Sequence, residues 1–123
     1  MNLVISNTSD DPIYQQIFDQ ISGQIIRGKL QSDFCLPPIR TVAKELRISV
    51  ITVKRAWEEL ERTGFIYTMA GKGCFVAPLP PKALDDKRNE LANEKLAKDM
   101  GYYKTLGLSL EEIVAMIKHN YGE

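Results

Sequence analysis

The chain has 123 residues, of which 44% are apolar and 26% charged, and its sixteen basic and sixteen acidic side chains give a net charge of zero. This composition excludes a disordered chain, and the length allows one domain and an appendage but not two large independent cores. The N-terminus lacks the cationic start and apolar run of a signal peptide, and no stretch is apolar enough to span a bilayer. We therefore expect a cytoplasmic protein with no membrane partner.

Side chains that carry catalytic or metal chemistry are sparse. Cys35 and Cys74 lie far apart in the sequence, without the spacing of metal ligands, and are expected to be reduced thiols. The single histidine, His119, stands close to the C-terminus, and no nucleophile–base pair or phosphate-binding loop is evident. The sequence therefore predicts no catalytic residue, no metal site, no cofactor and no enzymatic activity.

Three helices are predicted in the first part of the chain. Asp11 followed by proline is typical of an N-cap and a first helical position, and predicts a helix over about 12–27. A short second helix is expected over about 38–46, after two prolines. Ser49 can cap a third helix that runs to about Arg62 and buries a stripe of apolar residues at helical spacing.

A β-hairpin is expected to follow the helices. The β-prone runs 65–69 and 74–77 flank a glycine-rich turn that contains Gly71, Lys72 and Gly73. Three prolines between residues 78 and 81 then form a stiff linker. We accordingly place a first domain at 11–79 and a tail at 80–123.

The tail is predicted to form two helices that pair with a second copy of the chain. The first runs over about 82–106, and Ser109 and Glu112 have the spacing of a capping box that starts the second. Two such helices cannot enclose a ligand pocket of roughly 300–1,000 Å³, and they are too small to be stable alone. Their apolar faces predict a dimer interface. The candidate residues are Leu84, Leu91, Leu96, Met100, Tyr103, Ile113 and Ile117.

The second and third helices have the short connection and buried spacings of a helix-turn-helix. If the third helix enters a major groove, its first turn meets base edges. Ser49 and Thr52 then hydrogen-bond to bases or phosphates, and Val50, or as a second choice Ile51, contacts a thymine methyl group. Lys54 lies along the flank, where the phosphates run.

Alternatives remain for several of these side chains. Val50 and Ile51 are also suited to packing on the first helix or the hairpin. Arg55 can contact phosphate or pair with Glu59 one helical turn later. The hairpin turn is a weak signal by itself. Directly after a helix-turn-helix, however, it is typical of a wing whose glycines approach the minor groove and whose lysine adds positive charge.

The stretch LPPIRTVAKELRISVITVKRAWEELERTGFIYTMAGKGCFVA, with its flanks from residue 11 to 78, resembles the winged helix of the GntR family of bacterial transcription regulators. The resemblance implies that Arg40, the turn from Ser49 to Lys54, and the wing tip at Gly71, Lys72 and Gly73 contact DNA. The chain departs from the family pattern at three positions. Pro38 replaces a small or polar residue, Arg47 stands where glycine is frequent, and Val50 where arginine is frequent.

The short tail resembles that of the YtrA-like subfamily, whose members have a two-helix dimerisation tail. The resemblance implies a mainly α fold with a small β-hairpin, and a repressor of a transporter operon. We thus expect a sequence-specific transcription regulator that binds double-stranded operator DNA at an inverted repeat as a homodimer. The alternative is a ligand-gated regulator with a small-molecule effector pocket formed between protomers in the tail.

Overall fold

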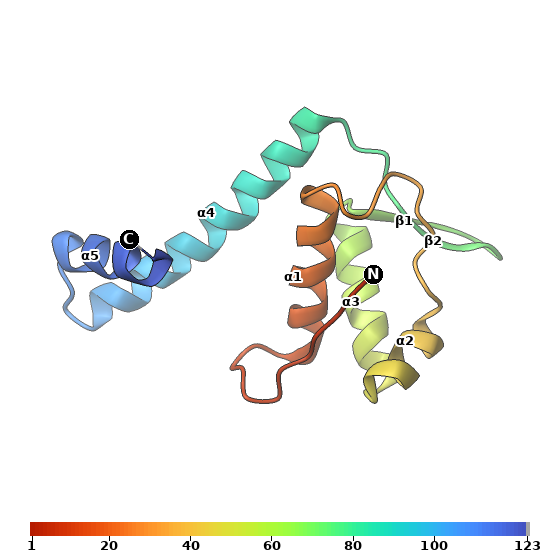
Figure 1. Ribbon diagram of the computed structural model, residues 1–123, viewed down its shortest axis with the longest axis horizontal. Helices are drawn as coiled ribbons and strands as arrows, with labels where there is room; N and C mark the ends of the chain where they lie inside the picture. The colour runs from red at the N-terminus through yellow and green to blue at the C-terminus, as the bar shows by residue number, and fades with distance from the viewer. Residues whose placement is uncertain (123) are drawn as a thin grey trace. The chain divides into compact units, whose positions relative to one another are not determined.

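The computed structural model describes residues 1–122, which form five helices and a two-stranded antiparallel sheet (Figure 1). The elements in chain order are α1 (Ile13–Ile26), α2 (Ile39–Leu46), α3 (Val50–Arg62), β1 (Ile66–Met69), β2 (Gly73–Val76), α4 (Pro81–Thr105) and α5 (Leu110–Tyr121). They group into two compact units, Met1–Leu84 and the residues from Asp85 onward. The predicted fold class, mainly α with a small hairpin, is confirmed.

The core of the first unit lies where α1 packs on α3. Apolar residues recur every three or four positions on both helices, so each presents one continuous apolar face to the other. Phe18 and Phe65 meet edge to face, with ring centroids 6.0 Å apart. Each such side chain stabilises the fold by roughly 1.5–3 kcal/mol when fully buried. The buried residues of the two helices and of the residue before β1 are Ile17, Phe18, Ile21, Ile25, Val53, Ala56, Trp57, Leu60 and Phe65.

The connection between α2 and α3 is a tight turn built on a left-handed residue. Arg47 adopts φ 57° and ψ 47°, and the Ile48 N–H donates to the Ala43 carbonyl at 3.0 Å. Glycine is favoured at this conformation because it has no Cβ, and arginine there costs about 1–2 kcal/mol. α2 starts directly after Pro38, without a side-chain cap. This turn determines how α3 leaves α2.

An extended N-terminal arm, residues 2–6, lies along α1 and was not anticipated from the sequence. The Gln20 side chain bonds both the N–H and the carbonyl of Val4 (2.8 and 2.6 Å), and Gln16 does the same for Ser6 (2.8 and 2.9 Å). Gln24 continues this row one turn further along the helix. Glutamines four residues apart share one helix face, which the sequence does show.

The start of α1 corrects one prediction. Asp11 does not cap the helix; Pro12 occupies the N-cap position, and no side chain caps the first turn. The Asp11 carbonyl instead accepts a hydrogen bond from Gln16 Nε2 at 3.0 Å. The backbone before Pro12 is therefore directed back toward the N-terminal arm, and the Asp11 side chain is not used as a cap.

The hairpin pairs Ile66 with Val76 and Met69 with Gly73 in antiparallel register. The loop before α2 adds a third extended segment, because Cys35 bridges to Phe75. Gly73 has φ 122°, a conformation that residues with a Cβ rarely adopt, so the tip requires glycine there. This gives the helix-turn-helix a short, well-anchored wing.

The second unit consists of most of α4 and α5. No residue of α4 is buried among those described, and the helix is polar around most of its circumference, with ion pairs such as Lys95–Asp99 at 3.2 Å. α5 begins with the predicted capping box: Ser109 Oγ accepts from the Glu112 N–H and Glu112 Oε1 from the Ser109 N–H. In residues 1–122, no helix is long and apolar enough to cross a membrane.

Candidate nucleic-acid interface

The first turn of α3 is held by a side-chain cap. Ser49 Oγ accepts a hydrogen bond from the Thr52 N–H at 3.1 Å and shares a second with Thr52 Oγ1 at 2.8 Å. Ser49 is exposed and Thr52 half-buried. The prediction that Ser49 caps this helix is confirmed. Both hydroxyls are thus fixed in position, and each has hydrogen-bonding capacity left for a base or a phosphate.

The two apolar residues that follow Ser49 face solvent. Val50 is 41% exposed and Ile51 78% exposed, whereas Val53, two positions later, is completely buried. The alternative in which Val50 and Ile51 pack on α1 or the hairpin is therefore wrong for Ile51 and at most partly true for Val50. The helix that would enter DNA carries an apolar surface at its N-terminal end.

Lys54 and Arg55 are adjacent in sequence but differ in their surroundings. Lys54 is exposed and makes no ion pair within the described chain. The Arg55 guanidinium stacks on the Tyr14 ring of α1, 3.8 Å from its centroid. The cation–π contact with Tyr14 favours a structural role for Arg55, whereas Lys54 has no ion-pair partner among the described residues.

The predicted pair between Arg55 and Glu59 is replaced by a different one. Glu59 accepts two hydrogen bonds from Arg62, one turn later on α3. These bonds hold the pKa of the Glu59 carboxyl below its usual value, and the nearby Arg55 charge lowers that pKa further. The carboxylate thus lies on the C-terminal half of α3, away from the turn that carries Val50 and Ile51.

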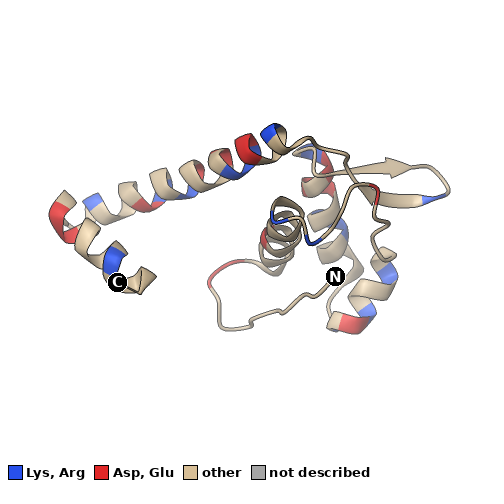
Figure 2. Cartoon of the chain, turned by 45° about the horizontal axis from the view of Figure 1, so that its top comes forward, with Lys and Arg blue, Asp and Glu red and all other residues tan. Residues whose placement is uncertain are grey.

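The remaining candidate residues, Arg40 on α2 and Gly71, Lys72 and Gly73 at the hairpin tip, are all exposed. Figure 2 shows the basic position at the tip of the hairpin and the basic positions on α2. In both views α2 and the hairpin lie on the side of the first unit away from α1. In these views, therefore, α1 covers neither α2 nor the hairpin.

The tail candidates fall into four groups. Leu96 and Ile117 are about half-exposed, whereas Leu91, Met100 and Tyr103 are partly covered. Ile113 is buried, with 5% of its surface exposed. Leu84 belongs to the first unit rather than to the tail. Further exposed apolar residues, not among our candidates, are Tyr102, Leu106, Leu110, Val114, Met116 and Tyr121.

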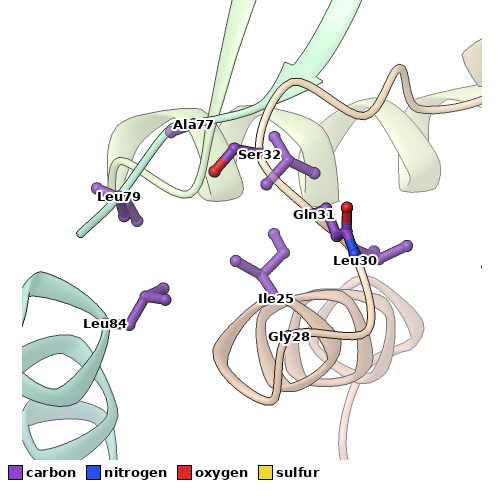
Figure 3. A pocket seen from close by; sticks show the side chains of 9 residues that line it. Ile25, Gly28, Leu30, Gln31, Ser32, Ala77, Leu79 and Leu84 are labelled. Atoms are coloured by element: carbon purple, nitrogen blue, oxygen red, sulfur yellow. The ribbon is translucent and has the colours of Figure 1, made fainter. Parts of the chain in front are cut away.

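A cavity of about 360 Å³ lies in the first unit, next to the linker (Figure 3). It is lined by aliphatic side chains from α1, β2, the linker and the first turn of α4, including Ile25, Leu79 and Leu84. None of its nine lining residues is charged, and none belongs to α3 or to the hairpin tip. The cavity is therefore separate from the candidate DNA surface. The effector pocket considered from the sequence was placed between two protomers, and it stays a prediction.

Residues 13–76 match the family model described as bacterial regulatory proteins, gntR family. The chain belongs to the GntR family. It is 34% identical over 110 residues to the uncharacterized HTH-type transcriptional regulator YhcF of Bacillus subtilis, which covers 89% of this chain and 90% of YhcF. These GntR relatives are transcription regulators and not enzymes.

Two solved structures extend the comparison. YtrA from Sulfolobus acidocaldarius, a GntR-family transcription factor, is 29% identical with a TM-score of 0.61, over 97% of this chain and 96% of YtrA. The DNA-binding domain of AraR, solved in complex with operator ORX1, is 26% identical with a TM-score of 0.55, over 63% of this chain and 96% of that domain. The full-length match to YtrA confirms the resemblance to the YtrA-like subfamily, including its short helical tail.

Proposed function

We propose that this GntR protein is a sequence-specific transcription regulator that places the first turn of α3 in a major groove of operator DNA. The observation that carries the proposal is the pattern of exposure on α3. Val50, Ile51 and Lys54 face solvent at the N-terminal end, while the opposite face is buried. A surface with hydroxyl, apolar and cationic groups together fits base edges and the phosphates beside them.

The wing and α2 supply the remaining contacts in this proposal. Lys72 at the exposed hairpin tip approaches the minor groove, where Gly71 and Gly73 let the backbone come close. Arg40, exposed on α2, contacts the phosphates that flank the first turn of α3. The AraR domain, bound to its operator, is a relative with the same winged fold and supports this mode of binding.

We infer that two chains form a homodimer through the tail. Exposed apolar side chains continue from the C-terminal half of α4 into α5, and Leu96 and Ile117 represent the two helices. A second copy is the partner that a closed, two-fold interface requires. Such a dimer presents two reading helices, so the operator is an inverted repeat with half-sites about 34–36 Å apart, one turn of DNA.

Our proposal for the regulated genes is based on the resemblance to the YtrA-like subfamily and not on the geometry of the structure. The YtrA of Bacillus subtilis, named as a transcriptional repressor, is 29% identical over 93% of this chain. We propose that the present protein represses an operon for a membrane transporter, and that it acts in the cytoplasm, where its operator DNA is found.

The proposal is tested by measuring transcripts in a strain that lacks the protein. Transcripts of the target operon are expected to rise, and to fall again when the wild-type chain is restored. A chain carrying both Arg40→Ala and Lys54→Ala serves as the matched control, because it keeps the fold but loses two DNA contacts. Unchanged transcripts across the genome would contradict the assignment as a regulator.

A further inference from the structure

We propose that Ile51 reads a base, and that each operator half-site places the C5 methyl group of a pyrimidine, ordinarily thymine, against its side chain. The inference rests on the proposed function, since it requires the first turn of α3 to lie in a major groove. It goes beyond that function because it assigns a chemical group of the operator to one residue of the protein.

The exposure of Ile51 is the first observation. Its side chain is 78% exposed, while the side chains of Val53, Ala56 and Leu60 on the same helix are completely buried. Residues in an α-helix are rotated by about 100° each, so Ile51 and Val53 point to nearly opposite sides. Ile51 therefore points away from the core, and most of its surface is left uncovered by the described residues.

Isoleucine has no evident structural role at this position. A β-branched side chain lowers helix propensity slightly, and an exposed one gains no burial that offsets this cost. The first turn is already stabilised by the cap that Ser49 supplies to Thr52. A contact outside the chain accounts for Ile51 better than any contact within it.

The chemistry of the groove identifies that contact. Base edges in the major groove present hydrogen-bond donors and acceptors, and the apolar exception is the thymine methyl group. An aliphatic side chain against a polar edge would remove water without replacing its hydrogen bonds, which is unfavourable. Against a methyl group it gains by excluding water from both surfaces. Ile51 therefore selects a methylated pyrimidine.

Val50 is the adjacent apolar residue, but its side chain is less available. It is 41% exposed, about half the value for Ile51, and it is one methylene group smaller. The hydroxyls of Ser49 and Thr52 are bonded to each other at 2.8 Å, so part of their hydrogen-bonding capacity is already used. Of the two exposed apolar side chains of the turn, Ile51 thus has more free surface.

The test removes the methyl group from DNA without changing base pairing. A symmetric operator is selected from random-sequence duplexes with the full-length protein, and each thymine is replaced in turn by deoxyuridine in both half-sites. At one position, replacing thymine by deoxyuridine is expected to lower the affinity of the protein roughly 4-fold per half-site, or about 15-fold for the dimer. This is the value for one buried methyl-sized group. A cytosine there should bind weakly, and 5-methylcytosine should recover most of that loss.

The protein variants assign the effect to the residue. Ile51→Ala should bind the thymine and deoxyuridine operators equally well, whereas Val50→Ala should keep the difference at this position. Both side chains are exposed, so neither variant should lose its fold, and circular dichroism checks this. Equal affinity of the wild-type protein for all thymine and deoxyuridine operators would overturn the proposal while leaving operator binding intact. So would a difference that persists undiminished in Ile51→Ala. Failure to select any operator would instead count against the proposed function.

Discussion

The guanidinium group of Arg55 lies over the ring of Tyr14, with its central carbon 3.8 Å from the ring centroid. Tyr14 stands in the first turn of α1, and Arg55 lies on α3 one turn after Ile51. The contact joins the beginning of α1 to the reading helix near the turn that we assign to DNA. It also separates two cations that are adjacent in sequence, since Lys54 makes no such contact.

Removing the Tyr14 ring should loosen this connection. Tyr14→Leu is expected to lower the free energy of unfolding by about 0.5–1 kcal/mol beyond the effect of lost apolar area, the value of an exposed cation–π contact. Tyr14→Phe keeps the ring and should behave like the wild-type protein. Urea unfolding measures the free energy of unfolding of each Tyr14 variant, once with Arg55 intact and once combined with Arg55→Met. If the free energies of unfolding of Tyr14→Leu and Tyr14→Phe differ by the same amount with Arg55→Met as with Arg55, the cation–π contact contributes nothing to stability.

The left-handed residue between α2 and α3 offers a stabilising substitution. Arg47 has φ 57°, a conformation in which glycine avoids the clash that a Cβ causes. Arg47→Gly should therefore raise the free energy of unfolding, by up to about 1 kcal/mol after the greater entropy of the unfolded glycine is deducted. Thermal denaturation measures this. Arg47→Ala is the control, since it removes the charge but keeps the strain, and it should not stabilise. A lower melting temperature for Arg47→Gly would contradict this.

The hydrogen bond from Tyr67 to Asp33 predicts a pH dependence of stability. The phenol donates to Asp33 Oδ1 at 2.7 Å, which raises the pKa of Tyr67 above its ordinary value of 10.0. Because the pKa of Tyr67 is raised in the folded state, the Tyr67–Asp33 hydrogen bond stabilises the fold fully below pH 10, and this stabilisation is lost as the pH rises through the folded-state pKa. Tyr67→Phe should have a lower free energy of unfolding than the wild-type protein at neutral pH. Between neutral and alkaline pH, its free energy of unfolding should fall by less than that of the wild-type protein. If the free energy of unfolding falls equally in the two proteins at alkaline pH, the Tyr67–Asp33 hydrogen bond is not the source of the pH dependence.

Much of this fold was accessible from local sequence signals. Ser49 and the Ser109–Glu112 pair marked helix starts correctly, because a capping side chain bonds to backbone within three residues and needs no tertiary information. The Asp11 prediction failed because a distant segment intervened. Gln16 bonds both the Asp11 carbonyl and Ser6 of the arm at residues 2–6, and the arm's bonds to Gln16 and Gln20 span ten to sixteen residues.

The candidate site was predictable in composition but not in orientation. Ser49, Lys54 and the hairpin tip follow from motif spacing, whereas the exposure of Ile51 depends on the rotation of α3 against α1. In the same way, sequence periodicity could not distinguish Ile113, which is buried, from Ile117, which is exposed. Both face the same broad apolar stripe of α5, and only packing decides which is covered.

Lys54 should contribute equally to the binding of any DNA duplex, whatever its base sequence. If its ammonium group touches phosphate, Lys54→Ala should weaken binding to operator and scrambled duplex by similar factors. It should also reduce the slope of log affinity against log salt by roughly 2 for a dimer, about 0.9 for each contact. Lys98→Ala, a lysine on α4, is the matched control and should leave the slope unchanged. An unaltered slope for Lys54→Ala would remove this residue from the interface.

A charge on the exposed apolar face of the tail should dissociate the dimer. Leu96→Asp and Ile117→Asp each place a carboxylate where we expect an apolar partner surface, twice per dimer. Each should raise the dimer dissociation constant at least about 10-fold, given roughly 1.5–3 kcal/mol for each buried aliphatic side chain. Asn93→Asp adds the same charge at a polar position of α4 and should have little effect. Sedimentation equilibrium measures the constants. Unchanged dimers in both apolar variants would place the interface elsewhere.

The central claim is that the exposed turn of α3 and the hairpin tip give sequence-specific binding to an inverted repeat. Its most direct test is a fluorescence anisotropy titration of the full-length protein on the selected operator and on a scrambled duplex of the same length, at one physiological salt concentration. We predict two protomers bound per operator, and an affinity at least about a thousandfold higher than for the scrambled duplex. Equal affinity for the two duplexes would contradict the account.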